Sequence, residues 1–249
     1  MEKKHDSMHK YGLIGKNIDY SFSKNYFSEK FNDEKIEATY ENFDCATFKD
    51  VSHLLSKKVE CSGFNVTIPY KQSIISLMSE MNKHAEVIGA VNTVKRMPNG
   101  RLKGFNTDHI GFIESIKPYL TKDHKSALIL GTGGSSKAIA YALERRDISF
   151  KYVSRKPTAD QLGYQDINGA LLAQYTIIIN CTPVGTHPNV KEAPKLPYRL
   201  INSQHLLYDL VYNPAETQFL KNGKEHGAQT VNGLEMLKLQ AEAAWRIWN

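Results

Sequence analysis

A glycine-rich segment in the middle of the chain has the residue types and order that bind phosphate groups. A strand-like run, 126–130, leads directly into Gly131-Thr132-Gly133-Gly134-Ser135, and a helical pattern follows. Glycines let the backbone turn tightly and approach a pyrophosphate, while the helix N-terminus offers unpaired N–H groups and partial positive charge. Ser136 stands where the general pattern has its third glycine, so a purely structural turn remains an alternative.

Two cations lie where the second strand of such a unit should end. An NAD site usually has Asp or Glu there, about 20 residues after the glycines, to bind the ribose hydroxyls. This chain has Ser154-Arg155-Lys156 instead. A hydroxyl and two cations suit the 2′-phosphate of NADP, although a solvated strand end would have the same composition. Together with the glycine loop, the segment predicts NADP as the cofactor.

Lys71 is the best candidate for proton chemistry in the first half. It follows Pro69 where the spacing of Ile74, Ile75 and Met78 predicts a helix over 71–81. A cation at a helix start opposes the helix dipole, so a purely structural lysine is unfavourable there. A solvated lysine is the alternative. Asp108 closes a turn before a predicted helix, and it could be an N-cap instead of a reacting group.

The composition is that of a folded globular protein, with 41% hydrophobic and 23% charged residues and a net charge of +6. Lys and Arg are scattered and form no basic tract, which argues against nucleic acid as a partner. The first ten residues lack the apolar stretch of a signal peptide, and no run is long enough to span a membrane. The three cysteines and nine histidines form no metal or redox motif. We therefore expect a cytoplasmic protein without a metal.

Strand and helix patterns alternate along the whole chain, which predicts an α/β fold with mostly parallel sheets. The first half has predicted helices at 24–32, 48–57 and 71–81, and Ser23 is a plausible N-cap of the first of these. Its predicted strands are 11–15, 38–43, 61–68, 91–96 and 102–106. The second half has strands predicted at 126–130, 150–153, 175–179 and 206–211, and a last helix over 234–248.

Five further motifs resemble those of shikimate dehydrogenases. The nine-residue string Gly63-Phe64-Asn65-Val66-Thr67-Ile68-Pro69-Tyr70-Lys71 is the most specific of them. The others are Ser21-Phe22-Ser23, Gly89-Ala90-Val91-Asn92-Thr93, Gly104-Phe105-Asn106-Thr107-Asp108, and Asn232-Gly233-Leu234 leading to Gln240. With the glycine loop, these motifs cover nearly the whole chain in the family's order.

The resemblance implies a substrate-binding domain over 1–107, joined by a C-terminal helix at 233–249, and a Rossmann-type NADP domain over 108–232. It implies Lys71 and Asp108 as the catalytic pair. The residues implied to bind substrate are Ser21, Ser23, Thr67, Asn92, Tyr212 and Gln240. Besides the glycine loop and 154–156, the resemblance implies cofactor contacts for Thr182, Val184, Gly233 and Met236. Helix capping by the serines and a core position for Met236 are the structural alternatives.

The implied reaction reduces 3-dehydroshikimate to shikimate with NADPH, with the Lys71 ammonium as proton donor and Asp108 holding it in line. Tyr20 and Lys24 depart from the family's usual His and Pro, so this loop should contact substrate differently. The nearer alternative is a quinate/shikimate dehydrogenase or a related cyclic hydroxy-acid dehydrogenase, and the more distant one is a catalytically silent NADP-sensing module. The implied partners are small molecules, and both a monomer and a homodimer are compatible with the sequence.

Overall fold

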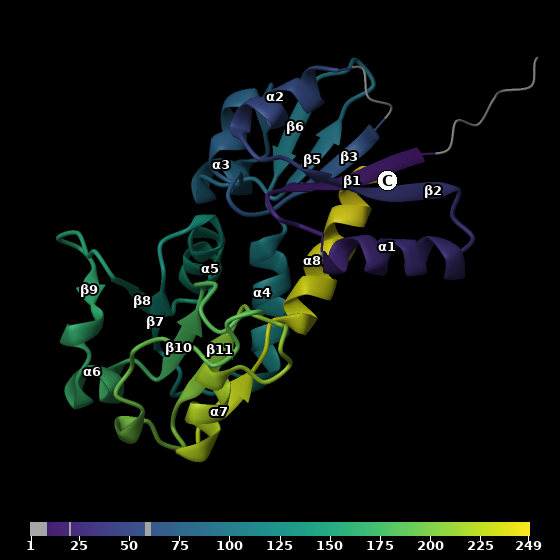
Figure 1. Ribbon diagram of the computed structural model, residues 1–249. Helices are drawn as coiled ribbons and strands as arrows, with labels where there is room; N and C mark the ends of the chain where they lie inside the picture. The colour runs from purple at the N-terminus through teal and green to yellow at the C-terminus, as the bar shows by residue number, and fades with distance from the viewer. Residues whose placement is uncertain (1–8, 20, 58–60) are drawn as a thin grey trace, which may run out of the picture. The chain divides into compact units, whose positions relative to one another are not determined.

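The structure is a computed structural model that describes residues 9–19, 21–57 and 61–249. Its internal contacts divide the chain into two compact units. The first unit contains residues 1–107 and 241–249, and the second contains residues 108–240. Each unit is built around its own six-stranded sheet (Figure 1).

The first unit has a mixed sheet with the strand order β2-β1-β3-β5-β6-β4. β1 lies between β2 and β3 and is parallel to both, whereas β5 pairs antiparallel with β3 and with β6. The bounds are β1 His9–Gly15, β2 Ala38–Asp44, β3 Cys61–Val66, β4 Glu80–Met81, β5 Thr93–Arg96 and β6 Leu102–Phe105. The predicted strands are present, and the segments 91–96 and 102–106 form an antiparallel hairpin.

The helices of the first unit pack against this sheet through two apolar clusters. They are α1 Phe22–Asp33, α2 Phe48–Ser56, α3 Lys83–Ile88, the 3₁₀ helix η1 Ser73–Leu77 and the last part of α8, Leu234–Trp248. One cluster joins α1, α8, β1 and β2 through aromatic rings, including Phe27, Tyr40 and Trp248. The other joins α2, α3 and η1 to β3 and β5 through aliphatic side chains.

The helix predicted over 71–81 is wrong. Lys71 lies in a turn, the helical part is the five-residue η1, and β4 follows at Glu80. The backbone N–H of Ser79 donates to the Leu102 carbonyl at 2.9 Å, and pairing with β6 continues from there. The apolar spacing that suggested a helix is satisfied by burying Ile74 from η1 instead. The helix-dipole argument for Lys71 therefore falls away.

The second unit has an entirely parallel sheet with the order β12-β11-β10-β7-β8-β9. The bounds are β7 Ser126–Leu130, β8 Ser149–Ser154, β9 Leu162–Gly163, β10 Ile177–Asn180, β11 Leu206–Asp209 and β12 Gln229–Val231. The chain starts in the middle at β7, runs outward to β9, and then returns to β10 on the other side. This is the doubly wound Rossmann order, and the direction reverses between β7 and β10.

Helices cover the parallel sheet on both faces, over two separate apolar clusters. They are α4 Asp108–Ile116, α5 Gly134–Glu144, α6 Gly169–Gln174, α7 Gln218–Glu225 and the start of α8; short 3₁₀ helices are η2 Lys117–Tyr119, η3 Tyr164–Asp166 and η4 Tyr198–Leu200. Within the described residues, no helix is both long enough and apolar enough to cross a lipid bilayer.

α8 is one continuous helix that belongs to both units (Figure 1, yellow). The contacts assign its residues up to Gln240 to the second unit and the rest, from Ala241, to the first. The sequence-based ranges placed all of 233–249 with the first domain. The assignment of substrate to the first domain and cofactor to the second stays a prediction.

Candidate functional site

The glycine loop lies at the point where the parallel sheet changes direction. It connects the C-terminal end of β7 to the N-terminus of α5, next to the C-terminal end of β10. In open α/β sheets, ligands bind in the crevice outside the strand ends at this point. The first turn of α5 contains no acidic residue, so the positive end of the helix dipole is not neutralised there.

Glycine is favoured at two positions of the loop, Gly131 and Gly133, for different structural reasons. Gly131 has a φ of +101°, which side-chain-bearing residues rarely adopt, and a Cβ there would come within 3.0 Å of Thr182 Cγ2. Gly133 is the N-cap of α5, and a Cβ built on it meets no atom of the described residues within 4 Å. The backbone is therefore open to a ligand at Gly133. Gly134 and Ser135 form the first turn of α5.

Ser136 explains how the loop works without a third glycine. Its side chain is fully buried, and its Oγ donates to the Gly133 carbonyl at 2.7 Å. The hydroxyl thus stabilises the turn from within the helix and does not project toward a ligand. The glycine pattern departs from the general one, but the cradle that it forms is retained.

Arg155 and Lys156 follow β8, the neighbour of β7 in the sheet. Leu130 and Val153 are paired in register, so the two strands end side by side. Arg155 and Lys156 are exposed, and the Lys156 N–H donates to Ser154 Oγ at 3.2 Å, which closes the turn. Cations on this strand end, with no carboxylate among 154–156, suit a phosphate on the ribose better than free ribose hydroxyls.

The loop after β10 is held by a buried amide. Asn180 Oδ1 accepts from the Thr182 backbone N–H at 3.1 Å and from Thr182 Oγ1 at 2.6 Å, while Asn180 Nδ2 donates to the Val184 carbonyl at 3.3 Å. Thr182 Oγ1 in turn accepts from the Val184 N–H at 3.3 Å. Thr182 is thereby fixed beside Gly131, and the cofactor contacts of Thr182 and Val184 stay predictions.

Asp209 ties this loop to the one after β11. Its carboxylate accepts from Asn180 Nδ2 at 2.9 Å, from the Val211 N–H at 3.0 Å and from Thr217 Oγ1 at 2.6 Å. Its side chain is fully buried, and burial raises the pKa of the carboxyl to about 6. Val211 and Thr217, two of the hydrogen-bond partners of Asp209, therefore lie on either side of the predicted ligand Tyr212. Tyr212 is half-buried. The sequence analysis did not single out Asp209, Asn180 or Thr217.

Gly233 directly precedes α8, and Met236 lies in the first turn of that helix. A Cβ on Gly233 would lie 2.2 Å from the Leu210 carbonyl oxygen, so only glycine allows this close approach. Met236 is 6% exposed and belongs to the apolar cluster with Phe112 and Tyr208. The structure thus gives Met236 the core role that the sequence left open, and its predicted cofactor contact remains a prediction. Gln240 is also buried, and its Nε2 donates to the Leu237 carbonyl at 2.9 Å.

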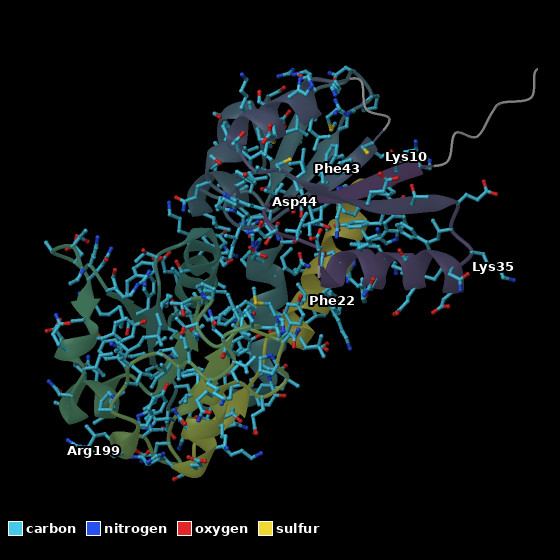
Figure 2. All side chains as sticks on the ribbon, viewed as in Figure 1. Lys10, Phe22, Lys35, Phe43, Asp44 and Arg199 are labelled. Carbon is cyan, nitrogen blue, oxygen red and sulfur yellow. The ribbon has the colours of Figure 1, made fainter. Side chains whose placement is uncertain are left out.

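The two serines of the first unit lie at the start of α1, where Figure 2 labels Phe22 between them in the sequence. The N-cap is Ser21 and not Ser23, so the predicted cap is displaced by two residues. Ser21 makes no capping hydrogen bond, and its buried Oγ has no partner among the described residues. Ser23 is 6% exposed. Tyr20 lies outside the described residues, and Lys24 is exposed.

Asn92 and Thr67 occupy neighbouring ends of β-structure in the first unit. Asn92 is 2% exposed, and its Oδ1 accepts from the Thr107 N–H at 2.7 Å, while its Nδ2 donates to Thr107 Oγ1 at 3.0 Å. The Asn92 carbonyl accepts from the Val66 N–H at 2.8 Å, directly before Thr67. This pairing brings the Thr67 and Asn92 segments together, as the substrate-binding prediction requires.

The backbone of Lys71 is hydrogen-bonded to the segment that contains Asn92. Its carbonyl accepts from the Val91 N–H at 2.7 Å, so the backbone of Lys71 is fixed next to Asn92. Lys71 is half-buried. Asp108 is the first residue of α4 and is 4% exposed. Lys71 belongs to the first unit and Asp108 to the second, so their pairing stays a prediction.

No group of three or more His, Cys, Asp or Glu side chains within residues 9–19, 21–57 and 61–249 is arranged to hold a metal ion. The polar side chains described above are instead hydroxyls, amides and cations. Such groups bind anions and hydroxyl-bearing ligands by hydrogen bonds, and they need no metal to do so.

Comparisons with known proteins agree with this chemistry. Residues 13–94 match a family model described as the shikimate dehydrogenase substrate binding domain. A shikimate dehydrogenase (NADP(+)) from Clostridium botulinum is 39% identical, over 97% of this chain and 96% of the relative. One from Methanococcus vannielii is 36% identical, over 95% of this chain and 90% of the relative.

Solved structures give the same result for the fold. Shikimate 5-dehydrogenase from Thermus thermophilus, in complex with NADP(H) and shikimate, superposes with a TM-score of 0.87 at 29% identity. The match covers 97% of this chain and 94% of that chain. The likeness therefore extends over both compact units and is not confined to the glycine loop.

Proposed function

The chain belongs to the shikimate dehydrogenase family, and on that premise we propose how its residues divide the work of the reaction. The protein is an NADP-dependent oxidoreductase that interconverts shikimate and 3-dehydroshikimate. The observation that carries the cofactor assignment is the glycine loop at the β7/β10 switch point, with Arg155 and Lys156 on the adjacent strand end. No carboxylate stands at 154–156 to repel a 2′-phosphate.

We propose that the second unit holds the dinucleotide. The N–H groups at the start of α5 bind the pyrophosphate, Gly133 leaves room for it, and Arg155 binds the 2′-phosphate with Ser154 and Lys156 beside it. Thr182, Val184 and Gly233 supply backbone and side-chain contacts along the same strand ends. When bound, NADPH supplies the hydride for the reduction.

We propose that Ser21 and Ser23 bind the substrate carboxylate, and that Thr67, Asn92, Tyr212 and Gln240 bind ring hydroxyls. The support is chemical. The unpartnered buried hydroxyl of Ser21 needs an acceptor, and the amide of Asn92 is held rigidly by Thr107. Fixed donors recognise a polyhydroxylated ring without paying the entropy of ordering flexible side chains.

Lys71 and Asp108 act at the reacting carbonyl in this proposal. As hydride reaches the carbonyl carbon, negative charge develops on the oxygen, and the Lys71 ammonium donates a proton to it. Asp108 accepts a hydrogen bond from Lys71 and from the neighbouring ring hydroxyl, which aligns both. In the oxidation direction, neutral Lys71 takes the proton back. Positioned acid–base groups of this kind contribute about 10² to 10⁴ in rate.

The test is steady-state turnover with shikimate and quinate, each against NADP⁺ and NAD⁺. We expect shikimate with NADP⁺ to be used at least about tenfold more efficiently than any other pair, which is a difference of about 1.4 kcal/mol. Preference for quinate would assign the chain to the quinate branch. NADP⁺ binding without turnover of either acid would identify a silent cofactor-binding module instead.

A further inference from the structure

Two side chains of the edge strand β2 hold the loop that leads to Ser21. We call the described residues 16–19 and 21, which connect β1 to α1, the Ser21 loop. Asn42 Nδ2 donates to the Ile18 carbonyl at 3.0 Å, and Asp44 Oδ1 accepts from the Asn17 backbone N–H at 3.0 Å. Figure 2 labels Asp44, the last residue of β2. Two consecutive residues of the loop are thus bound to one strand.

The alternation of side chains along β2 explains why both polar groups reach the loop. Successive side chains of a strand point to opposite faces, so Asn42 and Asp44 share one face and Phe43 takes the other. Phe43 packs against the aliphatic cluster, whereas Tyr40, on the face of Asn42, belongs to the aromatic cluster with α1. Asp44 is paired in register with Gly15, the last residue of β1. The chain that leaves β1 for α1 therefore meets both polar side chains.

The Ile18 carbonyl connects Asn42 directly to the backbone of Ser21. A carbonyl oxygen can only accept, so the Asn42 amide must turn its Nδ2 toward Ile18. The same oxygen accepts from the Ser21 backbone N–H at 3.0 Å. The Ile18 side chain is 8% exposed and belongs to the aromatic cluster, so it is held as well. The turn that places Ser21 at the N-cap of α1 is therefore fixed by Asn42 from outside the loop.

The bond from Asp44 supports an uncommon backbone conformation. Asn17 has a φ of +55°, in the left-handed region that residues with a side chain adopt infrequently. Its N–H is the group that donates to Asp44. One residue earlier, the Lys16 N–H donates to the Ile68 carbonyl at 3.2 Å, which ties the start of the loop to the segment that follows Thr67.

Asn42 contributes to the loop at a cost to the fold. Its Oδ1 is buried and has no hydrogen-bond partner in the part of the chain that the structure describes. A buried acceptor without a partner is unfavourable, whereas an apolar side chain of similar volume has no such atom. The asparagine at this half-buried position is therefore better explained by its bond to Ile18 than by the stability of β2.

We propose that Asn42 and Asp44 are positioning residues for Ser21, and that they hold the Ser21 loop in the conformation in which Ser21 Oγ meets the substrate carboxylate. The inference rests on the proposed function, because it assumes that Ser21 binds this carboxylate. Ser21 Oγ is buried and has no partner among the described residues, so only the backbone of the loop determines where it lies. When the loop is released, the apparent affinity for substrate falls in proportion to the fraction that remains competent.

Kinetics of Asn42→Leu, Ser21→Ala and the double variant test the proposal, with shikimate varied at saturating NADP⁺. We expect Asn42→Leu to raise the KM for shikimate about fivefold, as if about one loop in five stayed competent, and to leave kcat nearly unchanged. Ser21→Ala should raise the KM about tenfold or more, as for a lost charged hydrogen bond. In the Ser21→Ala background, Asn42→Leu should add less than about twofold, because no hydroxyl remains to be positioned.

The stability of Asn42→Leu separates positioning from a structural role. Its free energy of unfolding should equal or exceed that of the unmodified protein, because the unpartnered Oδ1 is removed. The matched control is Asn99→Leu. Asn99 also binds one backbone group of a turn, since its Oδ1 accepts from the Arg101 N–H at 3.0 Å, but this turn joins β5 to β6. Asn99→Leu should leave the KM unchanged, and the Kd for NADP⁺ should be the same in all variants.

Asp44 provides a second, independent pair of variants at an exposed position. Asp44→Ala removes the acceptor for the Asn17 N–H and should raise the KM about threefold, as for one exposed hydrogen bond. Asp44→Asn keeps an Oδ1 acceptor and should restore the KM. If Asn42→Leu fails to fold, this pair still decides the question, because equal KM values for Asp44→Ala and Asp44→Asn would overturn the proposal.

An unchanged KM in Asn42→Leu would overturn the proposal, and so would a cost that is the same with and without the Ser21 hydroxyl. Turnover of the unmodified protein with shikimate and NADP⁺ is measured in the same experiment. Its absence would refute the proposed function. A Ser21→Ala protein with an unchanged KM would refute the carboxylate contact of Ser21 and this inference with it. Normal turnover, a raised KM in Ser21→Ala and additive costs would refute only the positioning role.

Discussion

Lys71 tests the proposed chemistry most directly at the scale of single residues. We expect Lys71→Ala to lower kcat by two or more orders of magnitude, because the proton donor is lost as charge develops in the transition state. Lys71→Arg should not restore activity, since guanidinium holds its proton too tightly and differs in shape. Lys83→Ala, an exposed lysine of the same unit, is the control. The measurement is kcat at saturating shikimate and NADP⁺.

Asp108→Asn should also lower kcat, and it should add little to Lys71→Ala in the double variant. Residues that act as one unit show non-additive effects. The Kd for NADP⁺, measured by fluorescence titration, should stay the same in all of these proteins. A Lys71→Ala protein with near-normal turnover would remove the lysine from the mechanism and leave Asp108 as a helix-terminal residue of α4.

Arg155 tests the cofactor assignment. We expect Arg155→Asp to lower the ratio of kcat/KM for NADP⁺ over NAD⁺ by a factor corresponding to about 1–3 kcal/mol, because a charge-assisted phosphate contact is replaced by repulsion. Lys151→Asp makes the same charge reversal on an exposed residue of β8 and should change the ratio little. An unchanged ratio in Arg155→Asp would mean that Arg155 does not bind the 2′-phosphate.

At the scale of elements, Asp209 joins the ends of β10 and β11 to the N-cap of α7. Its folded-state pKa is about 6, against an ordinary value of 3.8. The folded protein therefore binds more protons than the unfolded chain between these values, and stability falls as pH rises through this window. A difference of about two pH units corresponds to about 3 kcal/mol. Below pH 4, this destabilisation is absent.

Asp209→Asn should remove this pH dependence. An asparagine can accept from Asn180 and Val211 through Oδ1 and donate to Thr217, as the protonated acid does. We therefore expect the difference in free energy of unfolding between Asp209→Asn and the unmodified protein, measured with urea, to change by about 3 kcal/mol in favour of the variant from pH 4 to pH 7. Asp50→Asn is the opposite control, because hydrogen bonds from Thr47 lower the pKa of Asp50. Parallel pH profiles for Asp209→Asn and the unmodified protein would contradict the prediction.

The elements also show where sequence analysis succeeded and where it did not. In the second unit, the four strands β7, β8, β10 and β11, the glycine turn and the helix over 234–248 were predicted, because these are local patterns, whereas the short strands β9 and β12 were not. Tertiary pairing decided the segment 71–81, where hydrogen bonds to β6 replaced a local helix. The short helices α3, α6 and α7 were missed, since six to eight residues give little periodicity.

The predicted site residues were found by motif, but their supporting residues were not. Tyr40 on β2 is 25 residues from its partner Asn65, and Asn180 is 29 residues from Asp209. Contacts of this range depend on strand order, which the sequence patterns did not specify.

At the scale of the whole molecule, the chain has two units with separate cores. The proposal places the cofactor contacts on the second unit and the main substrate contacts on the first, with Tyr212 and Gln240 of the second unit as additional substrate contacts. The carboxylate anchors, Thr67 and Asn92 belong to the first unit, and the glycine loop and Arg155 belong to the second. A ligand that binds a folded unit stabilises it by mass action, by about 2.7 kcal/mol at a ligand concentration of 100 times Kd. Each ligand should therefore protect mainly its own unit.

Amide hydrogen exchange with one ligand at a time measures this. We expect NADP⁺ alone to slow exchange by up to about 100-fold in β7, α5 and β8, and shikimate alone to do so in β1, β3 and β5. The other unit is the internal control in each sample, and Arg155→Asp should abolish the NADP⁺ effect while keeping the shikimate effect. Protection by NADP⁺ confined to residues 9–107 would reverse the assignment. Equal protection of both sheets by either ligand would mean that the two units unfold as one.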